Sequence, residues 1–251
     1  MLFRSARAEA ELATAANIHS QLVPDLELSL AGWRLAGKSV PSAGMGGDLL
    51  DAVARDDGGL DVVLVDVSGH GTRAGVVMAV VKAAIRASLL SRESISQVAA
   101  DANRVLCDVS PNDMFATACF VRTGAEGRVD MVVAGHPPAL IAGPGGVRPV
   151  ECEGSLPLGI RKSEAFEAVR LTLEQGESLV LYSDGVIEAG VNKLGIEDAF
   201  GDARLRAVVA DACKSREPKP SAVNGAVFMS VEAHAPPEDD VSVLTLCRET
   251  A

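Results

Sequence analysis

The sequence predicts an α+β fold in which short antiparallel strands and separate helices belong to one domain. Short runs of β-branched and apolar residues recur along the chain and are divided by Gly, Pro and Asp turns. Within residues 114–142 the segments between these runs are too short for crossover helices, so neighbouring strands are expected to pair antiparallel. The longer helical patterns lie outside this region, which is typical of the α+β class.

In the N-terminal part of the chain, each expected element has its own local signal. Residues 9–23 are rich in helix formers and end where Pro24 prevents the preceding residue from staying helical. Residues 27–36 alternate between apolar and polar side chains, which is the period of a half-buried strand. Residues 60–67 form a continuous apolar run with four valines, which predicts a buried central strand.

The middle and the end of the chain continue the same pattern. Thr72 is expected to cap an apolar helix over residues 72–90, and a second helix follows over residues 93–109. Two more helices are expected on either side of a polar stretch at residues 214–221. Gly143 to Gly146 are expected to form a hairpin loop. The remaining short strands are expected at residues 114–122, 129–134, 139–142, 171–173, 178–182 and 240–247.

The composition excludes several classes of partner. A formal net charge of −11 over 251 residues argues against nucleic acid and anionic membranes, because both select basic surfaces. The first residues lack the apolar run of a signal peptide, and Lys82 and Arg86 interrupt the best candidate for a membrane span. We therefore expect a cytoplasmic protein without membrane contact. Residues 1–24 are expected to form a linker or regulatory helix, and residues 25–251 one folded domain.

Aspartates at strand ends carry the chemistry that we expect. Asp48 follows two glycines, Asp66 and Asp184 precede Gly-containing turns, and Asp239 and Asp240 precede the last strand. Each one taken singly is explained as a turn residue or a cap. If the strand ends converge, however, the carboxylates repel one another by roughly 4 kcal/mol per pair at 4 Å with surface-like screening, so the cluster needs a cation. All-oxygen ligands favour Mg²⁺ or Mn²⁺, and two such ions would activate a water for attack on a phosphate.

The order and spacing of six short motifs add a family resemblance. Each motif is a weak signal alone, but the combination is specific. The motifs are Ala-Gly-Met-Gly-Gly-Asp at 43–48, Val-Asp-Val-Ser-Gly-His-Gly at 65–71, Ala-Gly-His-Pro-Pro at 134–138, Leu-Pro-Leu-Gly at 156–159, Tyr-Ser-Asp-Gly at 182–185 and Asp-Asp-Val-Ser at 239–242. Over about residues 26–248, the chain resembles the bacterial SpoIIE/RsbU branch of the PPM, or protein phosphatase 2C-like, serine/threonine phosphatases.

The resemblance implies a fold and a set of metal ligands. The fold is a four-layer αββα sandwich of two antiparallel sheets flanked by helices, so that residues 25–251 form a PPM-type phosphatase domain. Two Mn²⁺ or Mg²⁺ ions are implied at one end. Asp66 would bridge them, Val67 would offer its backbone carbonyl, Asp184 and Asp239 would complete one metal site, and Asp48 would belong to the other. Asp66 and Asp184 would thus act in catalysis through metal-activated water.

The resemblance also implies a substrate class and a role for the N-terminal helix. Bacterial members of the family typically dephosphorylate a phosphoserine or phosphothreonine on an anti-sigma-factor antagonist, so a phosphorylated protein of this kind is the expected partner. In those proteins a helix resembling residues 11–24 connects an upstream sensor to the catalytic domain. Here almost nothing precedes that helix, and we expect it to mediate a homodimer or to dock a separate regulator.

Several alternatives stay open at the level of the sequence. Asp240 is the alternative to Asp239 as a metal ligand. The general-acid histidine and the phosphate-binding arginine of animal relatives have no secure counterpart, and Ser68 occupies the position nearest to that histidine. Lys38 and His70 are weak candidates for substrate binding. A pseudo-phosphatase that binds a phosphoprotein without turnover is the alternative function, and a two-metal enzyme acting on a nucleotide or phosphodiester is a third.

Overall fold

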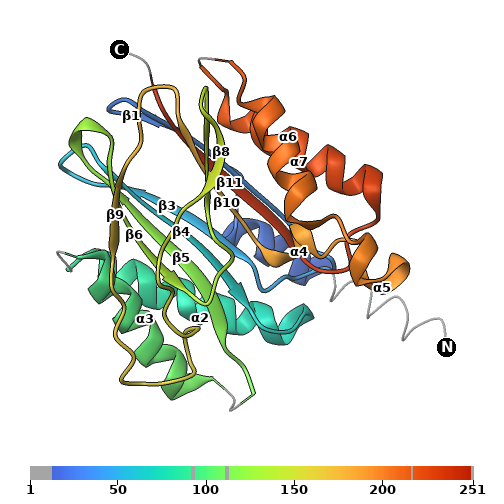
Figure 1. The fold of residues 1–251 in the computed structure, drawn as a ribbon. Helices are drawn as coiled ribbons and strands as arrows, with labels where there is room; N and C mark the ends of the chain where they lie inside the picture. The colour runs from blue at the N-terminus through green and yellow to red at the C-terminus, as the bar shows by residue number, and fades with distance from the viewer. Residues whose placement is uncertain (1–12, 92–93, 111–112, 216, 250–251) are drawn as a thin grey trace.

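The computed structural model describes residues 13–91, 94–110, 113–215 and 217–249. Two antiparallel sheets stack face to face, and a pair of long helices covers the outer face of each sheet (Figure 1). The predicted α+β class and the four-layer αββα arrangement are therefore confirmed. The long helices are α2 (Gly71–Leu89) and α3 (Ile95–Val109) on one side, and α6 (Gly201–Ala212) and α7 (Pro220–His234) on the other.

Every pairing of neighbouring strands in both sheets is antiparallel, as the short connections predicted. The first sheet contains, in spatial order, β1 (Leu26–Leu30), β2 (Trp33–Val40), β11 (Val241–Arg248), β10 (Ser178–Tyr182), β7 (Leu140–Gly143) and β8 (Gly146–Pro149). The second contains β3 (Leu49–Ala54), β4 (Leu60–Val67), β5 (Ala116–Thr123), β6 (Arg128–Ala134) and β9 (Val169–Thr172). Short helical turns complete the described elements, namely η1 (Ala125–Gly127), α4 (Asp184–Ile187), α5 (Val191–Leu194) and η2 (Ile196–Asp198).

The alternation of side chains along the central strands divides the core into two parts. On β11, Leu244 and Leu246 face the second sheet, whereas Val241 and Val243 pack with residues of α6 and α7. This two-residue period is that of a strand with apolar cover on both faces. The inner core continues beneath α2 and α3, so both sheets are held rigidly at the end where the aspartates lie.

The strongest local signals predicted their elements well. The strand expected at residues 60–67 coincides with β4, an interior strand of its sheet with all residues buried except the half-buried Asp66. The expected hairpin loop at Gly143 to Gly146 joins β7 and β8, whose register pairs these two glycines. The polar stretch at residues 214–221 separates α6 from α7.

Three local expectations differ from the structure. The single strand expected at residues 27–36 is wrong, because Ala31 and Gly32 adopt positive φ values of 49° and 84° and turn the chain between β1 and β2. Thr72 does not cap α2, since the helix begins one residue earlier with His70 at the N-cap position. Strands β3 and β8 were not anticipated, and both are short strands at the edge of a sheet.

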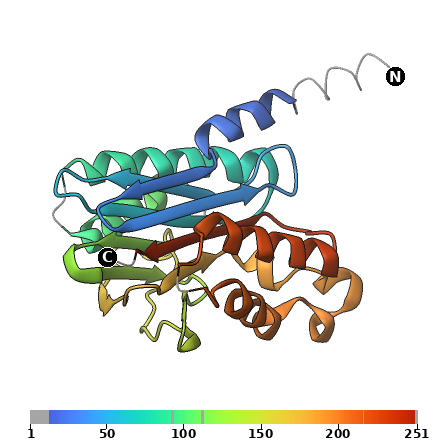
Figure 2. The same ribbon diagram turned by 90° about the horizontal axis from the view of Figure 1, so that it is seen from above.

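The N-terminal helix leaves the body of the domain (Figure 2). Residues 13–22 are helical, and the part expected at residues 9–12 lies outside the described residues. His19 and Val23 are buried against the domain, and the Lys82 ammonium on α2 donates a hydrogen bond to the Leu22 carbonyl at 2.6 Å. The expected division at residue 24 remains a prediction. None of the helices within the described residues has both the length and the apolar character that a membrane span requires.

A buried ion pair ties β4 to β5 and yields the first prediction. Arg122 donates from Nε to Asp61 Oδ1 at 2.7 Å and from Nη2 to Oδ2 at 2.8 Å, and the Asp61 side chain is 2 % exposed. Arg122→Met leaves the buried Asp61 carboxylate with the longer contact to Arg55 Nη1 at 3.5 Å, so we expect the free energy of unfolding to fall by about 3 kcal/mol in urea denaturation. Arg170→Met, on a 68 % exposed side chain, should change it by less than about 0.5 kcal/mol. Equal losses in both variants would contradict the assignment.

Candidate metal centre

Strand register brings four aspartate-bearing segments to one end of the sandwich. In the second sheet, Leu49 pairs with Val65, so Asp48 at the start of β3 lies beside the end of β4, where Asp66 is. In the first sheet, Tyr182 pairs with Val243, so the Asp184 segment after β10 lies beside the Asp239 segment before β11. Because the two sheets stack, both pairs of segments meet at the same end.

The electrostatics show that these carboxyl groups are close together. Burial, together with the charges of Asp184 and Asp239, raises the pKa of Asp66 to about 8. Asp66 and Asp184 also share a side-chain hydrogen bond, which two carboxyl groups can make when one of them holds a proton. The pKa of Asp239 is likewise raised, mainly by burial and also by the charges of Asp240 and Asp184. Asp66, Asp184 and Asp239, predicted as ligands, are therefore brought together.

Asp48 is the most deeply buried member of the cluster. Its side chain is 1 % exposed, and its Oδ2 atom has no hydrogen-bond partner. Burial raises its pKa well above the ordinary value, and the charge of Asp66 acts in the same direction, whereas hydroxyl contacts from Ser242 and Ser183 favour the ionised form. A buried acceptor without a donor beside a second carboxylate is an environment that a cation would satisfy.

The residues present fit divalent cations in chemistry. The donors are carboxylate oxygens, which Mg²⁺ and Mn²⁺ prefer over nitrogen or sulfur. In spacing, by contrast, no set of three or more His, Cys, Asp or Glu side chains in the described part of the chain is arranged to hold a metal ion.

Close backbone packing leaves the ends of β3 and β4 little freedom. The Val67 N–H donates to the Gly47 carbonyl at 3.4 Å. A Cβ atom on Gly47 would lie 2.6 Å from the Val67 carbonyl oxygen, so a larger residue at position 47 would push this loop away. Val67, the predicted backbone ligand, is thus held against the loop that presents Asp48.

The two adjacent aspartates before β11 have different roles. Asp240 is buried, and its carboxylate accepts hydrogen bonds from the Ser42 N–H at 2.8 Å, the Ser42 hydroxyl at 3.1 Å and the Gly47 N–H at 2.7 Å. The Asp239 side chain is exposed, and the hydrogen bonds from this loop go to Asp240 instead. Asp240 therefore positions the loop before Asp48, whereas the choice of Asp239 as the metal ligand remains a prediction.

Sequence reasoning missed residues that support this loop. The imidazole of His19, from the N-terminal helix, accepts a hydrogen bond from the Gly46 N–H at Nδ1 over 3.4 Å. Its pKa is lowered by burial, against the opposing charge of Asp240. The Ser183 hydroxyl donates to the Asp240 carbonyl at 3.2 Å and accepts from the Ser242 N–H at 2.9 Å. Both serines stand inside the quoted motifs, whereas His19 has no local signal.

The candidates for substrate binding lie in separate places. His70 is exposed at the N-cap position of α2, within electrostatic reach of Asp239. The Lys38 ammonium lies over the ring of Phe228 on α7, 5.7 Å from the ring centroid. The Ser68 hydroxyl accepts a hydrogen bond from the Phe115 N–H at 3.0 Å. Of the two predicted candidates, only His70 has a position that the structure relates to the acidic cluster.

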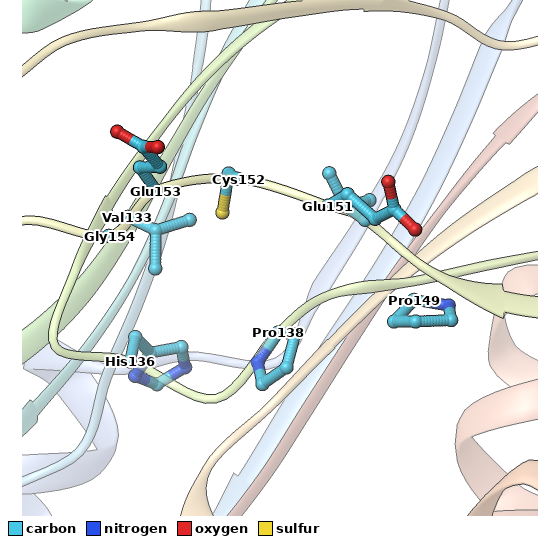
Figure 3. Close-up of a pocket in the computed structure, with 9 residues that line it drawn as sticks. Val133, His136, Pro138, Pro149, Glu151, Cys152, Glu153 and Gly154 are labelled. Atoms are coloured by element: carbon cyan, nitrogen blue, oxygen red, sulfur yellow. The ribbon is translucent and has the colours of Figure 1, made fainter.

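A separate hollow of about 640 Å³ lies between the segment at His136 and Pro138 and residues 149–154 (Figure 3). The Cys152 thiol points into it, whereas the carboxylates of Glu151 and Glu153 point away. None of the clustered aspartates lines this hollow. It is therefore distinct from the candidate metal centre.

Comparisons with known proteins agree with this architecture. Residues 56–249 match the family model described as Stage II sporulation protein E (SpoIIE). The chain is 27% identical over 152 residues to the phosphoserine phosphatase RsbP of Bacillus subtilis, covering 59% of this chain and 38% of that protein. It is 27% identical over 183 residues to the phosphoserine phosphatase RsbU of the same organism, covering 72% and 54%. The chain thus spans about half or less of the length of these relatives.

Solved structures show the same fold. The SiaA-PP2C domain of Pseudomonas aeruginosa superposes with a TM-score of 0.81 at 16% identity, over 98% of both chains. A structure of RsbU and RsbW domains from Mycobacterium tuberculosis gives a TM-score of 0.78 at 25% identity, over 90% of this chain and 62% of that one. RsbX in complex with magnesium gives 0.66 at 14% identity, over 89% and 98%.

The fold is that of the PP2C-type phosphatase domains. Because the family model covers more than half of the chain, this chain belongs to the SpoIIE family. The resemblance that the motifs indicated is confirmed.

Replacing each of the two adjacent aspartates by alanine tests their separate roles. Asp240→Ala removes the acceptor for two backbone N–H groups, so we expect the free energy of unfolding to fall by about 2 kcal/mol or more. The amide of Gly47 should also lose protection from hydrogen exchange. Asp239→Ala should change the stability of the metal-free protein by less than about 1 kcal/mol, because this carboxylate is exposed. A larger loss in Asp239→Ala than in Asp240→Ala would overturn the assignment.

His136 provides a prediction of pH dependence. Its Nδ1 atom lies 2.8 Å from the Thr117 hydroxyl, and burial lowers its pKa to about 3. In the unfolded chain this imidazole binds a proton near pH 6.5, whereas in the native protein it stays neutral. The free energy of unfolding therefore decreases as the pH falls. From pH 7 to pH 5.5 this loss amounts to about 1 kcal/mol. His136→Asn should lack this part of the pH slope in urea denaturation, and an unchanged slope would contradict it.

Proposed function

We propose that this chain is a metal-dependent phosphatase that hydrolyses a phosphoserine or phosphothreonine monoester on a protein. The observation that carries the proposal is the convergence of Asp66, Asp184 and Asp239 beside the buried Asp48, whose Oδ2 atom has no hydrogen-bond partner. The named relatives RsbP and RsbU are phosphoserine phosphatases, which supports the same reaction class.

The proposed cofactors are two Mn²⁺ or Mg²⁺ ions, held by the same carboxylates. Asp66 would lie between the two ions with the Val67 carbonyl beside it, Asp184 and Asp239 would hold one ion, and Asp48 would serve the other. Bound divalent ions supply an activated water and neutralise charge on the phosphate. The structure of RsbX in complex with magnesium, a protein of the same fold, supports this choice of cation.

The chain's own residues contribute position and charge. Asp240 fixes the loop before Asp48 through its three hydrogen bonds, so the ligand is held before any ion binds. The serine hydroxyls near Asp48 favour its ionised form, which is the form that binds a cation. The raised pKa of Asp66 favours its protonated form, and a bound divalent ion would favour the ionised form instead.

The finer substrate class rests on the family. We infer that the substrate is a phosphorylated anti-sigma-factor antagonist or a similar bacterial signalling protein, in the cytoplasm. A homodimer through the N-terminal helix is supported by the projection of this helix from the domain (Figure 2) and by Ile18, a large apolar side chain that is 47% exposed on it.

The alternative is a pseudo-phosphatase that binds a phosphoprotein without turnover. The specific observation in its favour is that the described acidic side chains, as they stand, are not arranged to hold an ion. The two functions differ in one measurable quantity, which is turnover in the presence of metal.

The decisive assay is hydrolysis of an aryl phosphate with Mn²⁺ or Mg²⁺. We expect activity that chelator abolishes, and a fall of at least about 100-fold in kcat for Asp66→Ala and Asp184→Ala. Mn²⁺ should also raise the melting temperature of the wild type but not of these variants, because only an intact site binds the ion. Asp211→Ala, at an exposed aspartate on α6, is the matched control and should behave as the wild type. Full activity in both site variants would reject the phosphatase.

A further inference from the structure

A small hollow lies at the start of α2, where the chain continues from the end of β4 that carries Asp66. It has a volume of about 270 Å³, and Ser68, His70, Arg73, Asp113 and Met114 contribute to its lining. Ser68 stands two residues after Asp66 in the chain, and His70 is within electrostatic reach of Asp239. The hollow is therefore placed to receive parts of a substrate whose phosphate is at the carboxylate cluster.

Arg73 is the one Lys or Arg among the residues that line this hollow, all of which the structure describes. Its Nη2 atom donates to Asp113 Oδ1 at 2.6 Å, and the two side chains are 58% and 67% exposed. An ion pair between side chains this exposed contributes little to stability, so another anion can displace Asp113 at small cost. The guanidinium has the planar fork that binds phosphate or carboxylate through two parallel hydrogen bonds.

The surroundings of the pair suit a peptide rather than a free ion. The Ser68 N–H donates to the Phe115 carbonyl at 2.9 Å, and the Phe115 N–H donates to the Ser68 hydroxyl, so the segment carrying Asp113 is fixed to the end of β4. Phe115 is 37% exposed, and Val76, three residues after Arg73 and on the same side of α2, is 55% exposed. A cation flanked by exposed apolar side chains offers both charge and contact area to a protein substrate.

The positive charge of Arg73 in this hollow is complementary to an anionic occupant. The protein has a net charge of −11, and the carboxylates beside the hollow add to the negative potential that an anionic phosphoprotein meets. We propose that Arg73 binds an oxyanion of the phosphoprotein substrate in exchange for Asp113, and thereby sets substrate affinity. The oxyanion is either the scissile phosphate or an acidic side chain next to the phosphoserine. This inference rests on the proposed phosphatase function.

Variants at the pair and three substrates test the proposal. The variants are Arg73→Ala, Arg73→Lys and Asp113→Asn, with Arg148→Ala as a matched control, because Arg148 is 54% exposed and pairs with Glu177 at 2.9 Å on β8. The substrates are p-nitrophenyl phosphate, a phosphoserine peptide with acidic neighbours and the same peptide with neutral neighbours. The measurements are KM and kcat with Mn²⁺, together with the affinity of each peptide by fluorescence anisotropy.

For the acidic phosphopeptide, Arg73→Ala should raise KM by about tenfold with kcat nearly unchanged, and Arg73→Lys should recover part of the loss. Asp113→Asn should lower KM by about twofold or more, because the competing carboxylate is gone. An equal loss with p-nitrophenyl phosphate identifies the scissile phosphate as the oxyanion that Arg73 binds. A loss confined to the acidic peptide identifies a substrate carboxylate.

Two results would overturn the proposal. One is a KM for Arg73→Ala within about twofold of the wild type and of Arg148→Ala on all three substrates. The other is an unchanged KM in Asp113→Asn, which would show that the substrate does not displace Asp113 from Arg73. Failure of the phosphatase function itself is distinguishable, because the wild type would then hydrolyse none of the substrates, while anisotropy would still report whether peptide affinity depends on Arg73.

Discussion

Mutual repulsion among neighbouring carboxylates is the constraint on which this end of the molecule depends. Asp48 and Asp66 lie where β3 begins and β4 ends in one sheet, whereas Asp184 follows β10 and Asp239 precedes β11 in the other. Loss of solvent and the neighbouring carboxylates together raise the pKa of Asp48, Asp66 and Asp239. Such a cluster is unfavourable by itself, so the rest of the fold must hold it in place. The two-part apolar core does so, because it fixes both sheets and therefore the ends of their strands.

The neighbouring aspartates differ in their hydrogen bonding and in their exposure. The Asp240 carboxylate accepts hydrogen bonds from two backbone N–H groups and one hydroxyl. These bonds make it an anchor for the glycine-rich loop. Asp239, the next residue in the chain, stays exposed and available. Asp66 and Asp184 reduce their repulsion by sharing a hydrogen bond. One class of side chain thus serves both to build the loop and to supply candidate ligands.

The surroundings of the cluster divide function between several segments. His19 brings the N-terminal helix into contact with the loop before Asp48, which gives this helix a physical connection to the candidate metal centre. At the start of α2, Arg73 is the one Lys or Arg among the residues that line the hollow at Ser68. Family membership accounts for the fold.

The sequence by itself determined the elements with strong local signals, such as the β-branched run of β4, and it indicated the aspartates through their glycine context and motif order. Only the tertiary structure decided that Asp240 anchors the loop while Asp239 stays exposed, that His19 contacts this loop, and that Arg73 lines the hollow at Ser68. The reason is physical: propensity and periodicity act over a few residues, whereas Asp240 meets Ser42 across 198 positions of the chain. Which partner a polar side chain finds is set by burial between distant segments, and no local pattern records it.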